Sequence, residues 1–288
     1  MEYCIGVDGG GTGCRVAIAE IDGTVLGRAE GGAANIATNF ETARSNILHT
    51  ISLAFVNAGV AKPDTAKTTV VLGLAGANLG DFKQRLELRL PYTKSHIVSD
   101  GETTLVGAIG EEDGIIGAIG TGSVYGRREH GEFTQLGGWG FLLGDDGSGA
   151  RIGRDMLNLA IKAFDGIEPH SPLTLEIIKE YQGSPIHIVE KAKAFAPRDF
   201  GQLAPRIVEA AKLGDVNAEA ILAQHTDTVR KSLDAVGFDP SKAFCMLGGL
   251  GTVFLKRLPT HYQDAARTPL GNALDGAVSL AISLSRST

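Results

Sequence analysis

The stretch Ile5-Gly6-Val7-Asp8-Gly9-Gly10-Gly11-Thr12-Gly13-Cys14-Arg15 places an acid and an open glycine turn directly after a short apolar strand. Because glycine lacks a Cβ atom, such a turn can bring its backbone N–H groups against phosphate oxygens. We expect Gly10 and Gly11 to make these contacts, with the Thr12 hydroxyl as a further donor. Asp8 is then placed to bind Mg²⁺, directly or through water. The sequence therefore predicts a nucleotide phosphate site.

The residues around this turn do not fit the two commonest phosphate loops. The chain contains no Gly-Lys dipeptide, which a Walker loop requires, and the glycines of the turn lack the GxGxxG spacing of a dinucleotide-binding loop. Strand-like residues 15–21 and 25–29 follow, so the motif is β-turn-β, not β-turn-α. An ordinary hairpin that uses its glycines for turn geometry alone is the alternative interpretation.

The composition indicates a globular protein with neither a nucleic-acid nor a membrane partner. The chain has 288 residues, 43% of them hydrophobic, which is enough to form the core of one large or two moderate domains. A net charge of −6 and the lack of a Lys/Arg run provide no basic face for nucleic acid or an anionic membrane. No leader pattern precedes the first strand, and no apolar run approaches the roughly 18 residues of a membrane span. We expect a cytoplasmic protein.

The three cysteines, Cys4, Cys14 and Cys245, indicate neither a disulfide framework nor a zinc site. Their number is odd, they form no CxxC pair, and no histidine lies near them at ligand spacing. Free cysteine packs as a small hydrophobe. We expect each of the three to be a buried strand residue.

The remaining chain repeats the β-turn-β plan. Buried strands are expected at 70–74 and 96–99, after a helix whose inner face is marked by Ile47, Ile51 and Phe55. A polar turn after Gly110 favours a domain boundary there. We therefore expect an N-terminal domain of residues 1–110, completed by a C-terminal helix at 273–288, and a larger second domain of residues 111–272.

The second domain opens with strands at 115–119 and 124–128, joined by the turn Gly120-Thr121-Gly122-Ser123. Residues 149–237 read as helical. Apolar residues at helical spacing define one buried face there: Leu222, Val229, Leu233 and Val236. A last strand at 243–247 ends in a third glycine turn, Gly248 to Thr252, and a final helix begins near Ala273.

Three such turns in this order resemble the actin-like ATPase superfamily of sugar kinases, Hsp70 and actin. Within it, GGWGFLLGDDGSGA at 137–150 resembles the BadF/BadG/BcrA/BcrD ATPase family, in particular its bacterial glucosamine and N-acetylglucosamine kinases. Residues 33–36, 165–172 and 197–202 also resemble that subgroup. The resemblance covers essentially the whole chain.

The resemblance implies an α/β fold of two duplicated ribonuclease H-like domains that flank a nucleotide and sugar cleft. It implies an enzyme that uses ATP and Mg²⁺ to phosphorylate the 6-hydroxyl of an amino sugar, and a homodimer. Whether the sugar is glucosamine or N-acetylglucosamine stays open, because the two differ only in the substituent on C2.

The resemblance also assigns roles to individual residues. Thr121 and Gly122 join Gly10, Gly11 and Thr12 at the phosphates. The adenosine is expected at Gly248, Gly249 and Leu250. The sugar is expected at Asn35, Asp100, Thr121, Gly138 and Asp145.

Asp100 is the candidate general base that takes the proton of the sugar 6-hydroxyl. It follows the strand at 96–99 and opens a helix that we expect to start near Glu102. An aspartate in this place also suits the N-cap of a helix, with no role in chemistry. The residues alone leave both interpretations open, and the resemblance favours the catalytic one.

The segment 137–150 leaves two further choices. Asp145 and Asp146 are adjacent, so in an extended backbone only one can point into a pocket, and we select Asp145. Trp139, the single tryptophan, either stacks on the sugar or serves as a packing anchor.

Two other functions share parts of this pattern. One is the ATPase that activates a 2-hydroxyacyl-CoA dehydratase or benzoyl-CoA reductase, which carries an iron–sulfur cluster on cysteine thiolates at a dimer interface. The other is a non-catalytic sensor of sugar or nucleotide. The positions of the three cysteines argue against the first, and the presence of both Asp8 and Asp100 argues against the second.

Overall fold

The computed structural model describes residues 2–61 and 63–287. The chain folds as two compact units. Unit 1 consists of Met1–Asp113, Arg128–Phe133 and Thr268–Thr288, and unit 2 of Gly114–Arg127 and Thr134–Arg267. Each unit has its own β-sheet, which confirms an α/β fold. The domain bounds expected from the sequence stay a prediction.

The sheet of unit 1 has five strands in the order β3-β2-β1-β4-β5. The strands are β1 (Cys4–Gly9), β2 (Cys14–Ala19), β3 (Val25–Gly31), β4 (Thr69–Leu74) and β5 (Lys94–Ser99). The pairs β1–β2 and β2–β3 are antiparallel, whereas β1–β4 and β4–β5 are parallel. Gly9 pairs with Cys14, so the predicted β-turn-β is confirmed, and the carboxyl ends of three parallel strands meet at one edge.

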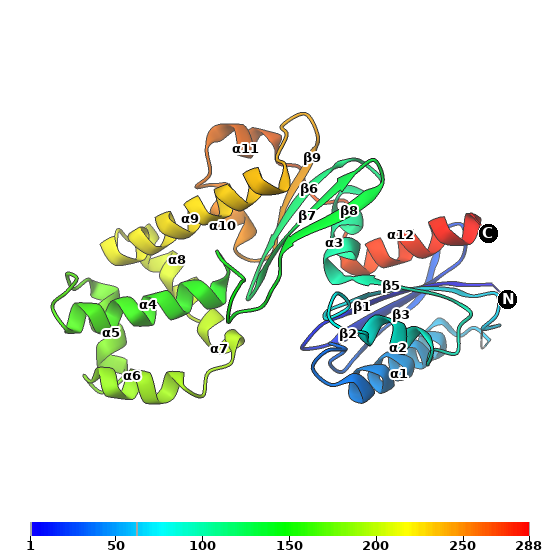
Figure 1. Cartoon of the computed structure of the whole chain (residues 1–288), viewed down its shortest axis with the longest axis horizontal. Helices are drawn as coiled ribbons and strands as arrows, with labels where there is room; N and C mark the ends of the chain where they lie inside the picture. Colours follow the sequence, from blue (N-terminus) through cyan, green and yellow to red (C-terminus); the bar gives the residue numbers. More distant parts are fainter. Residues whose placement is uncertain (1, 62, 288) are drawn as a thin grey trace. The chain divides into compact units, whose positions relative to one another are not determined.

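Helices cover both faces of this sheet, with α1 (Phe40–Ala58) on one face and α12 (Ala273–Arg286) on the other (Figure 1). The predicted inner face of α1 is confirmed, since Ile47, Ile51 and Phe55 are buried. Alternate strand residues point to opposite faces, so Ile5 packs in the cluster on the α1 side while Cys4 packs with α12. The short helix α2 (Phe82–Glu87) lies before β5 in the chain.

Helix α3 (Asp100–Ile109) packs closely against α12. A Cβ atom on Gly276 would lie 2.0 Å from the Thr103 carbonyl oxygen, so only glycine permits this approach. Asp100 opens α3, as expected, and the helix begins two residues before Glu102. The N-cap is Ser99, whose hydroxyl accepts a hydrogen bond from the Glu102 N–H, and the N-cap interpretation of Asp100 is therefore wrong.

Unit 2 is built on a four-stranded sheet in the order β8-β7-β6-β9, in which β6 and β9 are parallel. The strands are β6 (Gly114–Ile119), β7 (Ser123–Glu129), β8 (Glu132–Gly137) and β9 (Ala243–Leu247). The helices of this unit are α4 (Gly149–Phe164), α5 (Pro172–Glu180), α6 (Pro185–Ala192), α7 (Pro197–Gly201), α8 (Ala204–Lys212), α9 (Val216–Val236), α10 (Gly251–Leu255) and α11 (Thr260–Ala265). The predicted inner face of α9, from Leu222 to Val236, is buried, which confirms the helical period found in the sequence.

Cys4, Cys14 and Cys245 are strand residues with at most 1% of their surface exposed, as predicted. Among the described residues, no helix is long and apolar enough to cross a membrane.

Candidate active site

The first glycine turn, residues 10–13, is fixed by its own backbone. The Gly10 N–H donates to the Gly13 carbonyl (2.9 Å), and the Gly10 carbonyl accepts from the Ala34 N–H (2.9 Å). The turn borders a hollow of about 430 Å³ in unit 1 that is also lined by Asp8, Thr12 and Arg15. The structure thus brings the predicted phosphate residues and the predicted metal ligand of this unit together.

Asp8 lies in β1 opposite Arg15 of β2. Its Oδ2 atom accepts hydrogen bonds from Nε (2.9 Å) and Nη2 of Arg15. Among the described residues, no group of three or more His, Cys, Asp or Glu side chains could hold a metal ion.

Asp100, at the first position of α3, shares with Asp8 the sheet edge where the parallel strands β1, β4 and β5 end. Its side chain remains accessible to solvent. Even so, the surrounding protein displaces enough water to raise the pKa of the Asp100 carboxyl, and the negative charge of Asp8 raises it further. The Gly101 N–H donates to Asp100 Oδ1 (3.0 Å) and opposes this rise. The arrangement provides a solvent-accessible carboxylate with a strengthened affinity for a proton.

Asn35, predicted to bind sugar, lies in the loop after β3, and its side chain hydrogen-bonds to the backbone of that loop. Its Oδ1 atom accepts hydrogen bonds from the backbone N–H groups of Ala37 (3.0 Å) and Thr38 (3.1 Å). The carbonyl oxygen is thus used within the protein, and the amide nitrogen is the group of this side chain that remains to donate to a ligand.

The second and third glycine turns lie together in unit 2, because they follow the parallel strands β6 and β9. The Leu250 N–H donates to the Ile119 carbonyl (3.1 Å), and the Gly149 and Ala150 N–H groups of α4 donate to the carbonyls of Gly120 and Thr121. A pocket of about 500 Å³ is lined by residues of both turns and by apolar residues of α8 and α10: Gly120, Thr121, Gly249, Leu250, Ala204, Val208 and Val253. The structure thus brings the predicted adenosine residues and Thr121 together.

Four glycines of the three turns have no structural reason to be glycine. At Gly10, Gly11, Gly120 and Gly249, φ lies outside the left-handed region and an added Cβ would meet no atom within 4 Å. Gly248 and Gly138 differ, because their φ angles of +80° and +73° favour glycine and a Cβ would meet neighbouring atoms. A backbone left bare beside open space is what close approach of a ligand requires.

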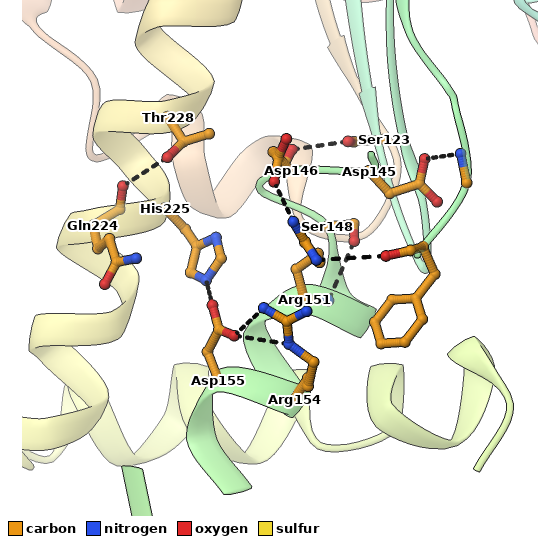
Figure 2. Close-up of polar contacts among 12 residues, drawn as sticks. Ser123, Asp145, Asp146, Ser148, Arg151, Arg154, Asp155, Gln224, His225 and Thr228 are labelled. Atoms are coloured by element: carbon orange, nitrogen blue, oxygen red, sulfur yellow. Dashed lines mark hydrogen bonds and ion pairs between the residues drawn. The ribbon is translucent and has the colours of Figure 1, made fainter. Parts of the chain in front are cut away.

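Asp145 and Asp146 contact different partners, as Figure 2 shows. The carboxylate of Asp145 accepts from the Gly140 N–H (3.2 Å), and a Cβ on Gly122 would lie 2.9 Å from its Oδ2 atom. Partial burial raises the pKa of Asp145. Asp146 instead forms an ion pair with Arg151 (2.9 Å). Of the two, Asp145 is the one that lies beside a predicted phosphate residue.

A family model described as the BadF/BadG/BcrA/BcrD ATPase family matches residues 5–258. The chain belongs to this family. It is 30% identical over 282 residues to the glucosamine kinase GspK of Vibrio cholerae, with 98% of this chain and 96% of the relative covered. It is 34% identical over 173 residues to an N-acetylmuramic acid/N-acetylglucosamine kinase of Clostridium acetobutylicum, which covers 57% of this chain and 55% of the relative.

A solved structure of a candidate N-acetylglucosamine kinase from Chromobacterium violaceum superimposes with a TM-score of 0.86 at 33% identity. The match covers 97% of this chain and 98% of the other. The predicted actin-like fold of the BadF/BadG/BcrA/BcrD family is therefore confirmed. Membership in an ATPase family supports the predicted use of ATP.

This member of the BadF/BadG/BcrA/BcrD family also contains a polar network that the sequence analysis did not find. His225 of α9 contacts Asp155 of α4 (Nε2 to Oδ2, 3.2 Å), and Arg154 donates to the other oxygen of Asp155 (Figure 2). Partial burial alone would raise the pKa of Asp155, but the contacts with His225 and Arg154 outweigh burial and lower this pKa. Seventy positions separate the histidine from the aspartate, so no local spacing reveals the pair. Trp139 is 70% exposed, which does not support its interpretation as a packing anchor.

Proposed function

We propose that this protein is an ATP-dependent amino-sugar kinase that phosphorylates the 6-hydroxyl of glucosamine or N-acetylglucosamine. The observation that carries the proposal is the pair of carboxylates Asp8 and Asp100 at the edge of the unit 1 sheet, beside a turn whose glycines face open space. The relatives support the substrate class, because the kinases named above act on amino sugars.

The proposed chemistry uses Asp100 as the base. Its carboxylate accepts the proton of the sugar 6-hydroxyl as that oxygen attacks the γ-phosphorus, and ADP leaves with the electron pair of the broken P–O bond. The raised pKa of Asp100 suits this task, because a base with a higher pKa takes a hydroxyl proton more readily. Mg²⁺, held by Asp8 directly or through water, would neutralise charge on the β- and γ-phosphates.

The remaining ligand contacts are assigned to residues in and near the three glycine turns. In unit 1, Gly10, Gly11 and Thr12 donate to the phosphates, and Asn35 binds the sugar with its amide nitrogen. In unit 2, Thr121 and Gly122 contact phosphate, while Gly248, Gly249 and Leu250 border the adenosine. Thr121, Gly138 and Asp145 contribute to sugar binding. We further propose that the protein is a homodimer, which light scattering would report as twice the 30.1 kDa chain mass.

The experiment that tests this function is coupled ADP release from Mg·ATP with glucosamine, N-acetylglucosamine, N-acetylmuramic acid, glucose or no sugar. The product is then identified by phosphorus NMR, and a 6-deoxy analogue of the preferred sugar serves as the control. We expect turnover with at least one amino sugar and none with its 6-deoxy analogue. ADP release that is independent of sugar would contradict the kinase assignment and favour the activator class.

The activator alternative has no support in the structure. An iron–sulfur cluster at a dimer interface needs thiolates that reach the surface, and all three cysteines are buried in strands. Burial also raises the pKa of the Cys14 thiol to about 12, which disfavours the thiolate that a cluster requires.

A further inference from the structure

Three charged residues form a row across the first three strands of unit 1. Asp8 of β1 is directly opposite Arg15 of β2, and Arg15 is directly opposite Glu30 of β3. Opposite residues of antiparallel strands share one face of the sheet, with Cβ atoms roughly 4.5–5.5 Å apart. All three residues line the hollow beside the first glycine turn. Arg15 thus occupies the middle position between two acidic residues, one of which, Asp8, is the predicted metal ligand.

The contact between Arg15 and Asp8 is one-sided. Both N–H groups of Arg15 donate to Oδ2, so Oδ1 accepts no hydrogen bond within the part of the chain that the structure describes. The Asp8 side chain is 16% exposed and that of Arg15 is 47% exposed. The guanidinium therefore holds one carboxylate oxygen and leaves the second for a cation or for a water bound to one.

Charge explains the third member of the row. Asp8 and Arg15 alone sum to zero formal charge, which would remove most of the attraction for Mg²⁺. Glu30, which is opposite Arg15 in the strand register, returns the row to a net charge of −1. Neither the phosphate contacts nor the sugar contacts proposed above use Arg15 or Glu30.

We propose that Arg15 and Glu30 are positioning residues for the metal ion, with Arg15 orienting Asp8 and Glu30 keeping the row negative. Hydrogen bonds to a metal-binding carboxylate fix its orientation and affect metal affinity without touching the metal. This inference rests on the proposed use of Mg²⁺ with the nucleotide.

The test measures binding of Mn²⁺, as a paramagnetic substitute for Mg²⁺, to full-length protein saturated with ADP, with free Mn²⁺ followed by electron paramagnetic resonance. Arg15→Lys keeps the charge but loses the two-pronged donor geometry, and we expect about tenfold weaker Mn²⁺ binding. Glu30→Gln removes one negative charge at an exposed site, and we expect roughly twofold to fivefold weaker binding at low salt, with a smaller effect at high salt.

Arg28→Met is the matched control. Arg28 lies two residues before Glu30 on the same face of β3 and pairs with Asp275 of α12 (3.1 Å), so its loss should leave Mn²⁺ affinity unchanged. All variants should keep the wild-type melting temperature within a few degrees, since these side chains are partly exposed.

Three results would overturn the inference. The first is wild-type Mn²⁺ affinity in both Arg15→Lys and Glu30→Gln. The second is weaker binding of ADP without metal in Arg15→Lys, which would make Arg15 a direct nucleotide ligand. The third is wild-type protein that binds no Mn²⁺ in the presence of ADP. The first two leave sugar phosphorylation by the wild type intact, so failure of this inference is distinguishable from failure of the proposed function.

Discussion

Substituting the two adjacent glycines of the third turn by alanine should separate folding from nucleotide binding. At Gly249 the backbone is outside the left-handed region and the space for a Cβ is open, so Gly249→Ala introduces no clash. Such a change typically stabilises a protein by about 0.4–1 kcal/mol, because the unfolded chain loses freedom. At Gly248, φ is +80° and a Cβ would lie 2.2 Å from the Ile119 carbonyl oxygen.

The magnitudes follow from these geometries. Gly248→Ala incurs about 1–2 kcal/mol for the left-handed backbone and roughly 1–3 kcal/mol for the forced displacement of packed atoms. At roughly 2–4 °C per kcal/mol for a chain of 150–250 residues, its melting temperature should fall by at least about 4 °C. Gly249→Ala should melt at or slightly above the wild-type temperature.

For ATP binding, in contrast to stability, the expected effect of Gly249→Ala is unfavourable. Gly249 lines the pocket of about 500 Å³ in unit 2, and a methyl group there would intrude on a bound adenosine. An overpacking cost of about 1–3 kcal/mol corresponds to a rise of roughly fivefold to 150-fold in the KM for ATP, with the KM for sugar less affected. Thermal melts followed by circular dichroism and coupled ADP release at varied ATP give both quantities. If Gly249→Ala melts as low as Gly248→Ala, or keeps the wild-type KM for ATP, the open space at Gly249 does not mark a ligand.

Three further predictions address the carboxylates. Asp100→Asn should keep ADP affinity and the wild-type melting temperature but lose about 10²–10⁴-fold in kcat; a near-normal kcat would remove Asp100 as the base. Because the pKa of Asp100 is raised and the base acts when deprotonated, kcat/KM should fall on acidification with a midpoint above the ordinary 3.8, and a midpoint at or below 3.8 would contradict that role. Asp155→Asn should cost about 1–3 kcal/mol in unfolding free energy at neutral pH, because it removes the negative charge that strengthens the contacts with His225 and Arg154. Folding lowers the pKa of Asp155, so the stabilisation by its carboxylate is present above the unfolded-state pKa and is lost as the pH falls through the folded-state pKa. Thermal melts of the variant at acidic pH should therefore depend less on pH than those of the wild type.

Much of the fold is predictable from the sequence because the decisive signals are local. The first β-turn-β, the inner face of α1 and the four apolar positions of α9 depend on periods of two or 3.6 residues, which a linear sequence displays directly. The N-cap of α3 is harder to predict, because Ser99 and Asp100 are adjacent and both residue types cap helices. Only the backbone shows that Ser99 takes the extended N-cap conformation and that Asp100 is already helical.

The site is less predictable, because its contacts join residues that are distant in the chain. The row from Asp8 through Arg15 to Glu30 depends on the register of two strand pairs, and a shift of one residue would place Glu30 on the opposite face. The contact between Asp155 and His225 depends on how α4 packs against α9. Spacing carries no information about either contact, so the sequence predicts a role for Asp8 but not its partner Arg15.

The glycines show most directly what structure adds to a motif. A glycine costs roughly 0.5–1 kcal/mol in folding entropy relative to alanine, so its presence requires a reason at each position. Gly9 would place a Cβ 2.6 Å from a methyl carbon of Leu74, which is a packing reason. Gly10, Gly11, Gly120 and Gly249 have neither a packing nor a conformational reason in the protein alone. We therefore expect a ligand on that side of the turns, and a phosphate or adenosine held against bare backbone would account for the four glycines.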